Sequence, residues 1–105
     1  MVSSATYPAL DRSPTPALFS KTIVTGLLRG RLGFGGVVIT DSMNAPGART
    51  AGAPQRAIRA GVDLLLYTSE RSSAVGFTKL LAAARRDPAL RTRLREAYRS
   101  ISSIR

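Results

Sequence analysis

The clearest pattern in the chain is a short apolar run that ends in an acid. Residues 37–41 read Val-Val-Ile-Thr-Asp and follow Gly35-Gly36. A run of this length, rich in β-branched residues and without alternating polar positions, predicts a strand buried on both faces, as in parallel sheets. Residues 62–67, Val-Asp-Leu-Leu-Leu-Tyr, predict a second such strand, and residues 1–7 predict the end of another.

Between and after these runs, apolar residues recur at helical spacing. Helices are expected from an N-cap at Ser20 to the glycines at 30 and 33, from Ala53 to Gly61, over 75–84, and from Pro88 onward. The last helix is expected to bury one apolar face, made of Leu90, Leu94, Ala97, Tyr98, Ile101 and Ile104. Strands that alternate with helices predict an α/β fold with parallel strands. The loops after the strands (8–19, 42–53 and 68–73) are long, which is typical of α/β folds whose site lies at the carboxyl ends of the strands.

Composition limits the chemistry that the chain can perform. Its 105 residues form at most one small domain, and 44% hydrophobic residues argue against a disordered chain. The sequence has no Cys and no His, which excludes disulfides, thiolate nucleophiles, Cys/His zinc sites and Ser-His-Asp triads. No apolar run approaches the roughly 18 residues that suggest a membrane span. We therefore expect no cofactor and no membrane segment, and the sequence leaves the localisation open.

The net charge of +10 raises the question of an acidic partner. Basic residues become dense near the C-terminus, at Arg85, Arg86, Arg91, Arg93, Arg95, Arg99 and Arg105. One interpretation is a small basic α/β module that binds nucleic acid or an acidic surface. Such binders usually combine Arg with exposed aromatic residues or glycine loops, and neither is expected in this region. We therefore expect no nucleic-acid partner.

Asp41 is the strongest candidate for chemistry. A carboxylate at the end of a parallel strand lies where barrel and open α/β enzymes place catalytic groups. From its position alone, Asp41 could equally cap a turn or the start of a helix. The residues by themselves leave both interpretations open.

A longer motif around Asp41 resembles a known family. Residues Leu28–Ser42 resemble the nucleophile segment of glycoside hydrolase family 3, which typically reads LLRGELGFDGVVITDDL. Met1–Asp11 is similar to the preceding strand and loop of that family, VMxAHxxYPxLD, and Ala57–Leu66 is similar to AxxAGADLLL. These motifs occur in the family's order and spacing and cover most of the first 70 residues. The bacterial β-N-acetylglucosaminidase type is the most similar subgroup.

The resemblance implies a fold and a place in it. The catalytic domain of the family is a (β/α)8 TIM barrel, and the matched segments correspond to its last three βα units. A whole barrel needs about 250 residues. Residues 1–105 are therefore expected to be the C-terminal part of a catalytic barrel, with Met1 an internal methionine or the start of a truncated gene model, and the rest of the barrel missing.

The resemblance also implies a retaining hydrolase of terminal β-linked N-acetylglucosamine or glucose, with Asp41 as nucleophile and a carbohydrate as substrate. Ser4 stands where the family often has a substrate-facing His. Met43 is expected to replace part of an apolar pocket wall, because Ala45 stands where the family often has Met. In the acetylglucosaminidase subgroup the acid/base is a His, so a chain without His lacks that partner and is expected to be inactive alone.

Another carboxylate could in principle act as the acid. Asp11 and Glu70 are expected on loops at the same edge as Asp41, with Glu70 the better candidate and Asp11 structural. Asp63 is expected at the opposite end of its strand. The remaining acids, Asp87 and Glu96, are expected to be solvated or ion-paired.

Overall fold

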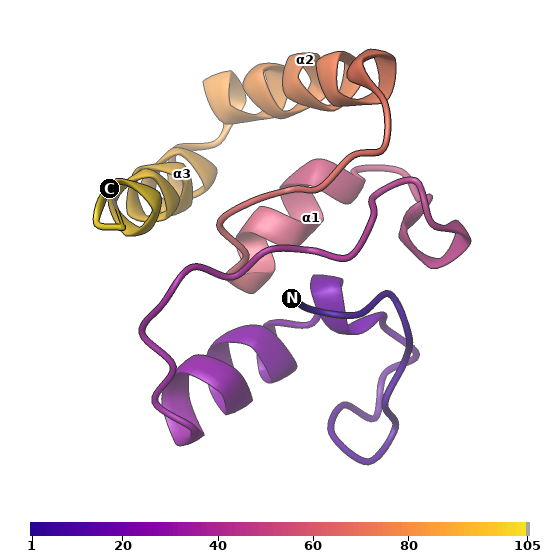
Figure 1. Ribbon diagram of the computed structural model, residues 1–105, viewed down its shortest axis with the longest axis vertical. Helices are drawn as coiled ribbons and strands as arrows, with labels where there is room; N and C mark the ends of the chain where they lie inside the picture. The colour runs from indigo at the N-terminus through magenta and orange to yellow at the C-terminus, as the bar shows by residue number, and fades with distance from the viewer. Residues whose placement is uncertain (105) are drawn as a thin grey trace.

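The computed structural model describes residues 1–104. The chain is mainly helical (Figure 1). The α-helices are α1 (Ala53–Ala60), α2 (Glu70–Arg86) and α3 (Pro88–Ser102). They are accompanied by the short 3₁₀ helices η1 (Ala17–Phe19) and η3 (Pro46–Ala48) and by the π-helix η2 (Thr22–Arg31). No helix of the described chain is both long enough and apolar enough to span a membrane.

The segments predicted as strands are extended but do not form a sheet. Parallel bridges pair Val2 with Thr40 and Ile39 with Leu64, and each is an isolated bridge. The predicted fold class, α/β with parallel strands in a partial (β/α)8 TIM barrel of about three βα units, is therefore wrong for this chain. Within residues 1–104 the structure has helices and isolated bridges and no strand ladder.

Side chains take the hydrogen bonds that a ladder would need. The N–H of Leu66 donates to Oγ1 of Thr40 (3.0 Å), and the N–H of Val38 donates to Oδ2 of Asp63 (3.0 Å). A regular ladder would pair each of these N–H groups with a carbonyl of the neighbouring segment. The bridges consequently stop on both sides of the Ile39–Leu64 pair. Hydrophobic pattern alone does not reveal this competition, because Thr is common in strands and the partner of each side chain lies on a distant segment.

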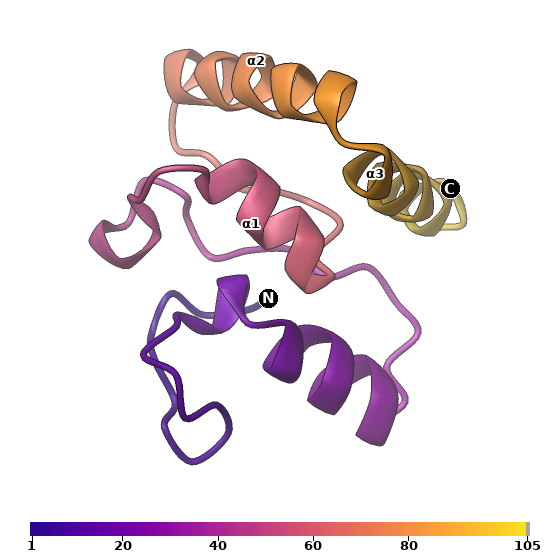
Figure 2. The same ribbon diagram turned by 180° about the vertical axis from the view of Figure 1, so that it is seen from behind.

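Helix α1 lies at the centre of the molecule (Figures 1 and 2). It contacts α2 and α3 on one side and η1 and η2 on the other. Ala57, Ala60 and Val62 contribute to a main core, together with Leu18, Val24 and Val38 from the N-terminal part. Ile58 points to the opposite side of α1, where it packs in a second core with Ala84 and Leu90. Small alanines on α1 allow both layers to approach it closely.

The helix predictions were mostly correct. Helix α1 ends at Gly61 as expected, and α3 begins at Pro88, where Oδ1 of Asp87 accepts the N–H groups of Ala89 and Leu90. Ser20 caps the start of η2 by accepting the Ile23 N–H at 3.1 Å. Helix α2 was predicted to begin at residue 75 but begins at Glu70. The segment 69–73 looked like a loop because it is rich in serine, yet Oγ of Ser69 accepts the Ser72 N–H and caps the helix.

One predicted face of α3 is only half covered. Leu90 and Ala97 are buried, whereas Tyr98 and Ile104 are 65% and 68% exposed. The predicted inward position of Tyr98 was wrong, because α1 and α2 cover only the part of α3 that carries Leu90, Leu94 and Ala97.

Candidate functional site

Asp41 lies at the end of the central extended segment and is half-buried. Its backbone N–H donates to the Val2 carbonyl (2.7 Å), which ties it to the neighbouring segment. Its Oδ1 accepts the N–H of Ser42 at 2.7 Å. The carboxylate is therefore held by its own backbone turn, and an ionised carboxylate accepts such a bond well.

Asn44 joins the loops that lie beyond Asp41. Its Oδ1 accepts the N–H of Thr68 (2.9 Å), and its own N–H donates to Oγ of Ser42 (3.1 Å). The loop after Asp41 and the loop before α2 are thereby fixed to each other. Sequence reasoning did not single out Asn44. The signal that could have found it is its place two residues after Ser42, a spacing at which short polar side chains bond local backbone.

Ser4 and Met43 occupy different environments. Ser4 is half-buried, and its backbone packs against Gly47, where an added Cβ would come within 2.7 Å of the Ser4 carbonyl oxygen. Met43 is only 6% exposed and belongs to the main core, and its N–H donates to the Leu66 carbonyl. Met43 also borders a hollow of about 310 Å³, together with residues that include Asn44, Tyr67 and Lys79. The substrate-binding roles of Ser4 and Met43 stay predictions.

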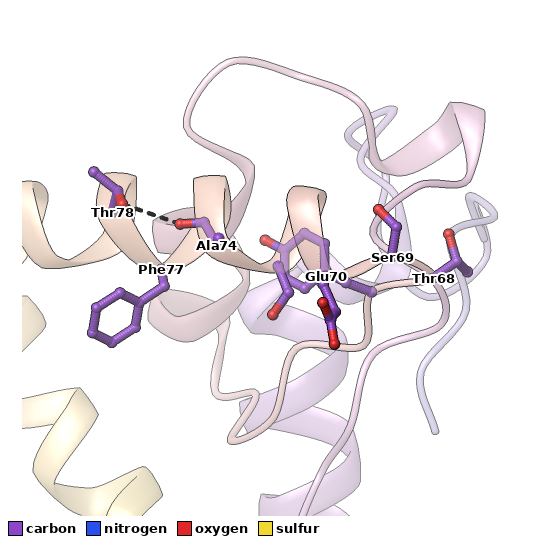
Figure 3. Close-up of a pocket in the computed structure, with 8 residues that line it drawn as sticks. Thr68, Ser69, Glu70, Ala74, Phe77 and Thr78 are labelled. Atoms are coloured by element: carbon purple, nitrogen blue, oxygen red, sulfur yellow. Dashed lines mark hydrogen bonds between the residues drawn. The ribbon is translucent and has the colours of Figure 1, made fainter.

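The two candidate acids lie in places that do not favour that role. Glu70 is the first residue of α2, is exposed, and lines an open hollow of about 660 Å³ with Ser69, Ala74 and Phe77 (Figure 3). Asp41 is not among the residues that line this hollow. Asp11 accepts hydrogen bonds from Ser20 and Ser13, and these bonds, the one from Ser20 foremost, hold the pKa of its carboxyl below the usual value. A general acid is favoured by a raised pKa, so the lowered pKa of Asp11 argues against that role, and its structural role stays a prediction.

Replacing Ser20 with alanine is expected to raise the pKa of Asp11 toward its ordinary value, because Oγ of Ser20 donates to Oδ2 of Asp11 at 2.6 Å. A lowered folded-state pKa stabilises the fold above the ordinary pKa of the carboxyl, and this contribution is lost as the pH falls through the folded value. Ser20→Ala should therefore reduce the loss of stability in acid. An NMR titration of the Asp11 carboxyl carbon measures the shift, with Ser103→Ala as control. An unchanged Asp11 pKa would contradict the assignment.

Asp63 is the centre of a buried ionic cluster. Its side chain is 1% exposed, and its Oδ2 lies 2.6 Å from Nη2 of Arg29 while also accepting the Val38 N–H. Arg93 of α3 approaches Oδ1 at 3.5 Å and donates to the carbonyls of Val62 and Ile58. The cluster joins η2, α3 and the segment that leads to Asp41. These contacts hold the three segments together, which supports a structural role for Asp63.

The other acids are paired as expected. Asp87 forms an ion pair with Arg59 (2.5 Å), whose hydrogen bond lowers the pKa of Asp87. Glu96 pairs with Arg93 at 2.9 Å. In the part of the chain that the structure describes, no group of three or more His, Cys, Asp or Glu residues is arranged to hold a metal ion.

Comparisons with known proteins identify the family. A family model described as the glycosyl hydrolase family 3 N terminal domain matches residues 1–103. A β-hexosaminidase of Chromobacterium violaceum is 37% identical over 86 residues, which are 78% of this chain and 24% of that protein. A protein of Arthroderma benhamiae described as an uncharacterized secreted glycosyl hydrolase is 35% identical over 111 residues, covering 99% of this chain and 31% of the relative.

A solved structure agrees with these matches. The crystal structure of β-N-acetylhexosaminidase from Beutenbergia cavernae superposes with a TM-score of 0.85 at 36% identity, covering 97% of this chain and 31% of that one. The chain thus spans about a quarter to a third of the length of the relatives it matches. The matching model is that of the N-terminal domain, so the predicted placement in the C-terminal part of a catalytic unit is not confirmed. The match over nearly the whole chain shows that this protein belongs to glycosyl hydrolase family 3.

Proposed function

We propose that this chain carries the nucleophile of a retaining glycoside hydrolase that releases terminal β-linked N-acetylglucosamine or glucose, and that Asp41 is this nucleophile. Family membership and the β-hexosaminidase names of several relatives support the reaction class and the sugar. The position and hydrogen bonding of Asp41 are the observations that carry the proposal.

In this proposal a carboxylate oxygen of Asp41 attacks the anomeric carbon of the sugar. The bond from that carbon to the leaving oxygen breaks, and a glycosyl ester of Asp41 forms, which water then hydrolyses. The Ser42 N–H fixes the orientation of the carboxylate. Ser4, which follows the segment bridged to that of Asp41, would face the sugar, and Met43 would support the apolar side of the pocket.

The leaving oxygen needs a proton from a donor about 5–5.5 Å from the nucleophile. The sequence has no His, Asp11 has a lowered pKa, and Glu70 lines a hollow that does not include Asp41. We therefore propose that residues 1–105 form part of a larger catalytic unit, whose other parts supply the acid/base and the remaining sugar contacts. The short share of the relatives' length that this chain covers supports this view.

The test is to trap the covalent intermediate. The aligned segment of the Chromobacterium violaceum β-hexosaminidase would be replaced by this chain, and the chimera treated with a 5-fluoro glycosyl fluoride of N-acetylglucosamine. The fluorine slows the oxocarbenium-like steps, so the glycosyl ester accumulates. Mass spectrometry of the digest is expected to find the sugar on the peptide that contains Asp41, and no label in the Asp41→Asn chimera.

A label on another residue of an active chimera would refute the role of Asp41. The 105-residue chain alone is expected to show no turnover of a nitrophenyl N-acetylglucosaminide. Turnover by the chain alone that disappears in Asp41→Ala would refute the proposed need for further parts while supporting the nucleophile.

A further inference from the structure

The exposed side of α3 combines arginines with an aromatic ring. Arg95, Tyr98 and Arg99 line one hollow of about 400 Å³ together with Leu94. These three residues, called the α3 strip below, lie within about one turn, with the two arginines roughly 6 Å apart along the helix axis. Tyr98 is 65% exposed, although the pattern of apolar positions predicted that it would be buried.

The charge of the strip is not neutralised by nearby acids. Glu96, its acidic neighbour on α3, pairs with Arg93, and Asp87 at the start of the helix pairs with Arg59. Within residues 1–104, neither Arg95 nor Arg99 forms an ion pair. With a net charge of +10 on the whole chain, this surface attracts anions.

A second exposed ring lies across Leu94 from the strip. Leu94 borders the hollow of Tyr98 and also a second hollow, of about 210 Å³, that is lined in part by Phe77. Phe77 is 68% exposed, and Figure 3 shows its ring projecting from α2. Two open rings and two free guanidinium groups therefore share one region of the surface.

We propose that the α3 strip binds single-stranded nucleic acid, with a base stacked on Tyr98 and backbone phosphates on Arg95 and Arg99. Unpaired bases stack on aromatic side chains, and arginines neutralise phosphates, which is the combination that single-strand binding uses. The absence of exposed aromatics was the reason to expect no nucleic-acid partner from sequence, and the position of Tyr98 removes that reason. This inference is independent of Asp41 and of the proposed hydrolase.

The ring distinguishes nucleic acid from other polyanions. An acidic glycan or an anionic membrane would also be attracted by Arg95 and Arg99, but neither offers a base to stack on Tyr98. A test of the ring at constant charge, combined with a direct comparison of the affinities for the three kinds of polyanion, therefore separates these partners.

Binding would be measured by fluorescence anisotropy of the full chain with a labelled thymidine single strand of about 20 nucleotides, from about 50 mM salt upward. Tyr98→Leu is expected to weaken binding about tenfold, because the stacking of one base is lost, and Tyr98→Phe should retain the affinity. The Arg95→Gln/Arg99→Gln variant should bind at least about tenfold more weakly and lower the salt slope by about 1.4, since each lost phosphate contact removes about 0.7. Arg12→Gln/Arg31→Gln, which has the same net charge as that variant and changes exposed arginines elsewhere, should have little effect.

Circular dichroism would confirm that each variant stays folded, as expected for exposed positions. Three results would overturn the proposal: no binding of the thymidine strand at the lowest salt, equal effects of the two arginine pairs, or affinity unchanged in Tyr98→Leu. Stronger binding to heparin or to phosphatidylserine vesicles than to the thymidine strand would also overturn it, and would assign the strip to an acidic glycan or a membrane.

Discussion

Replacing Asp63 with alanine is expected to lower the free energy of unfolding by about 3–5 kcal/mol, a large part of the stability of a small domain. The carboxylate is 1% exposed and neutralises Arg29 at 2.6 Å, with Arg93 at 3.5 Å. Its removal leaves the Arg29 guanidinium without its counter-ion, leaves Arg93 with only the exposed Glu96, and leaves the Val38 N–H without its acceptor. Both arginines are about one fifth exposed and can partly reach water, so we expect a value near the lower end of this range.

Urea unfolding followed by circular dichroism measures this effect. Glu96→Ala is the matched control, because it removes another carboxylate partner of Arg93, but one that is 53% exposed and worth less than about 1 kcal/mol. Asp63→Asn can keep an acceptor for the Val38 N–H. Its loss of unfolding free energy should therefore lie between those of Asp63→Ala and Glu96→Ala. If Asp63→Ala cost no more than Glu96→Ala, the cluster would not support the fold.

Gly61→Ala is expected to lower the free energy of unfolding by about 2–4 kcal/mol, because backbone strain and a steric clash add together. Gly61 has φ = 120°, which side-chain-bearing residues rarely adopt. An added Cβ would lie 2.5 Å from Oγ1 of Thr25 and 3.1 Å from Cγ1 of Val24. Val24 is fully buried in the main core, so it has little freedom to move away.

Gly35→Ala is the control for Gly61→Ala, since a Cβ at Gly35 meets nothing within 4 Å. It should leave the midpoint of urea unfolding unchanged or raise it slightly. Adding Thr25→Ala to Gly61→Ala removes the nearest clashing atom. The double variant should therefore lose less free energy of unfolding than the two single variants lose in total. If the two effects were strictly additive, the Cβ added at position 61 would not clash with Thr25.

Local signals explain which parts of the fold could be predicted. Helices α1 and α3 were found because Gly61 marks the end of one and Pro88 the start of the other through backbone chemistry that is visible in the sequence. The start of α2 was missed because Ser69 serves as a cap inside a segment whose composition resembles a loop.

The prediction of a sheet was wrong for a reason that is not local to either segment. Whether the Leu66 N–H bonds a carbonyl or Oγ1 of Thr40 depends on how two distant segments meet, and no pattern within either segment reveals it. The same holds for Tyr98, which is exposed because no described element covers that side of α3.

The candidate site was predictable only in part. A carboxylate at the end of an apolar segment indicated Asp41, and the structure places it beside a fixed loop. Asn44, which fixes that loop to the next, acts through a contact with Thr68 that sequence spacing alone does not encode. Its importance became visible only when the two loops were seen together.

The bonds of Arg93 have a consequence for synthesis of the chain. Arg93 belongs to the last helix, yet its guanidinium donates to the carbonyls of Ile58 and Val62 and approaches Asp63, which in turn receives the Val38 N–H. On a ribosome, where residues emerge in order, Ile58, Val62 and Asp63 cannot gain their contacts with Arg93 until α3 has left the exit tunnel. During that interval Ile58 and Leu65, which pack in the second core with Leu90 of α3, remain incompletely covered. Nascent chains that pause before α3 would therefore be the species most exposed to chaperones and to misassembly.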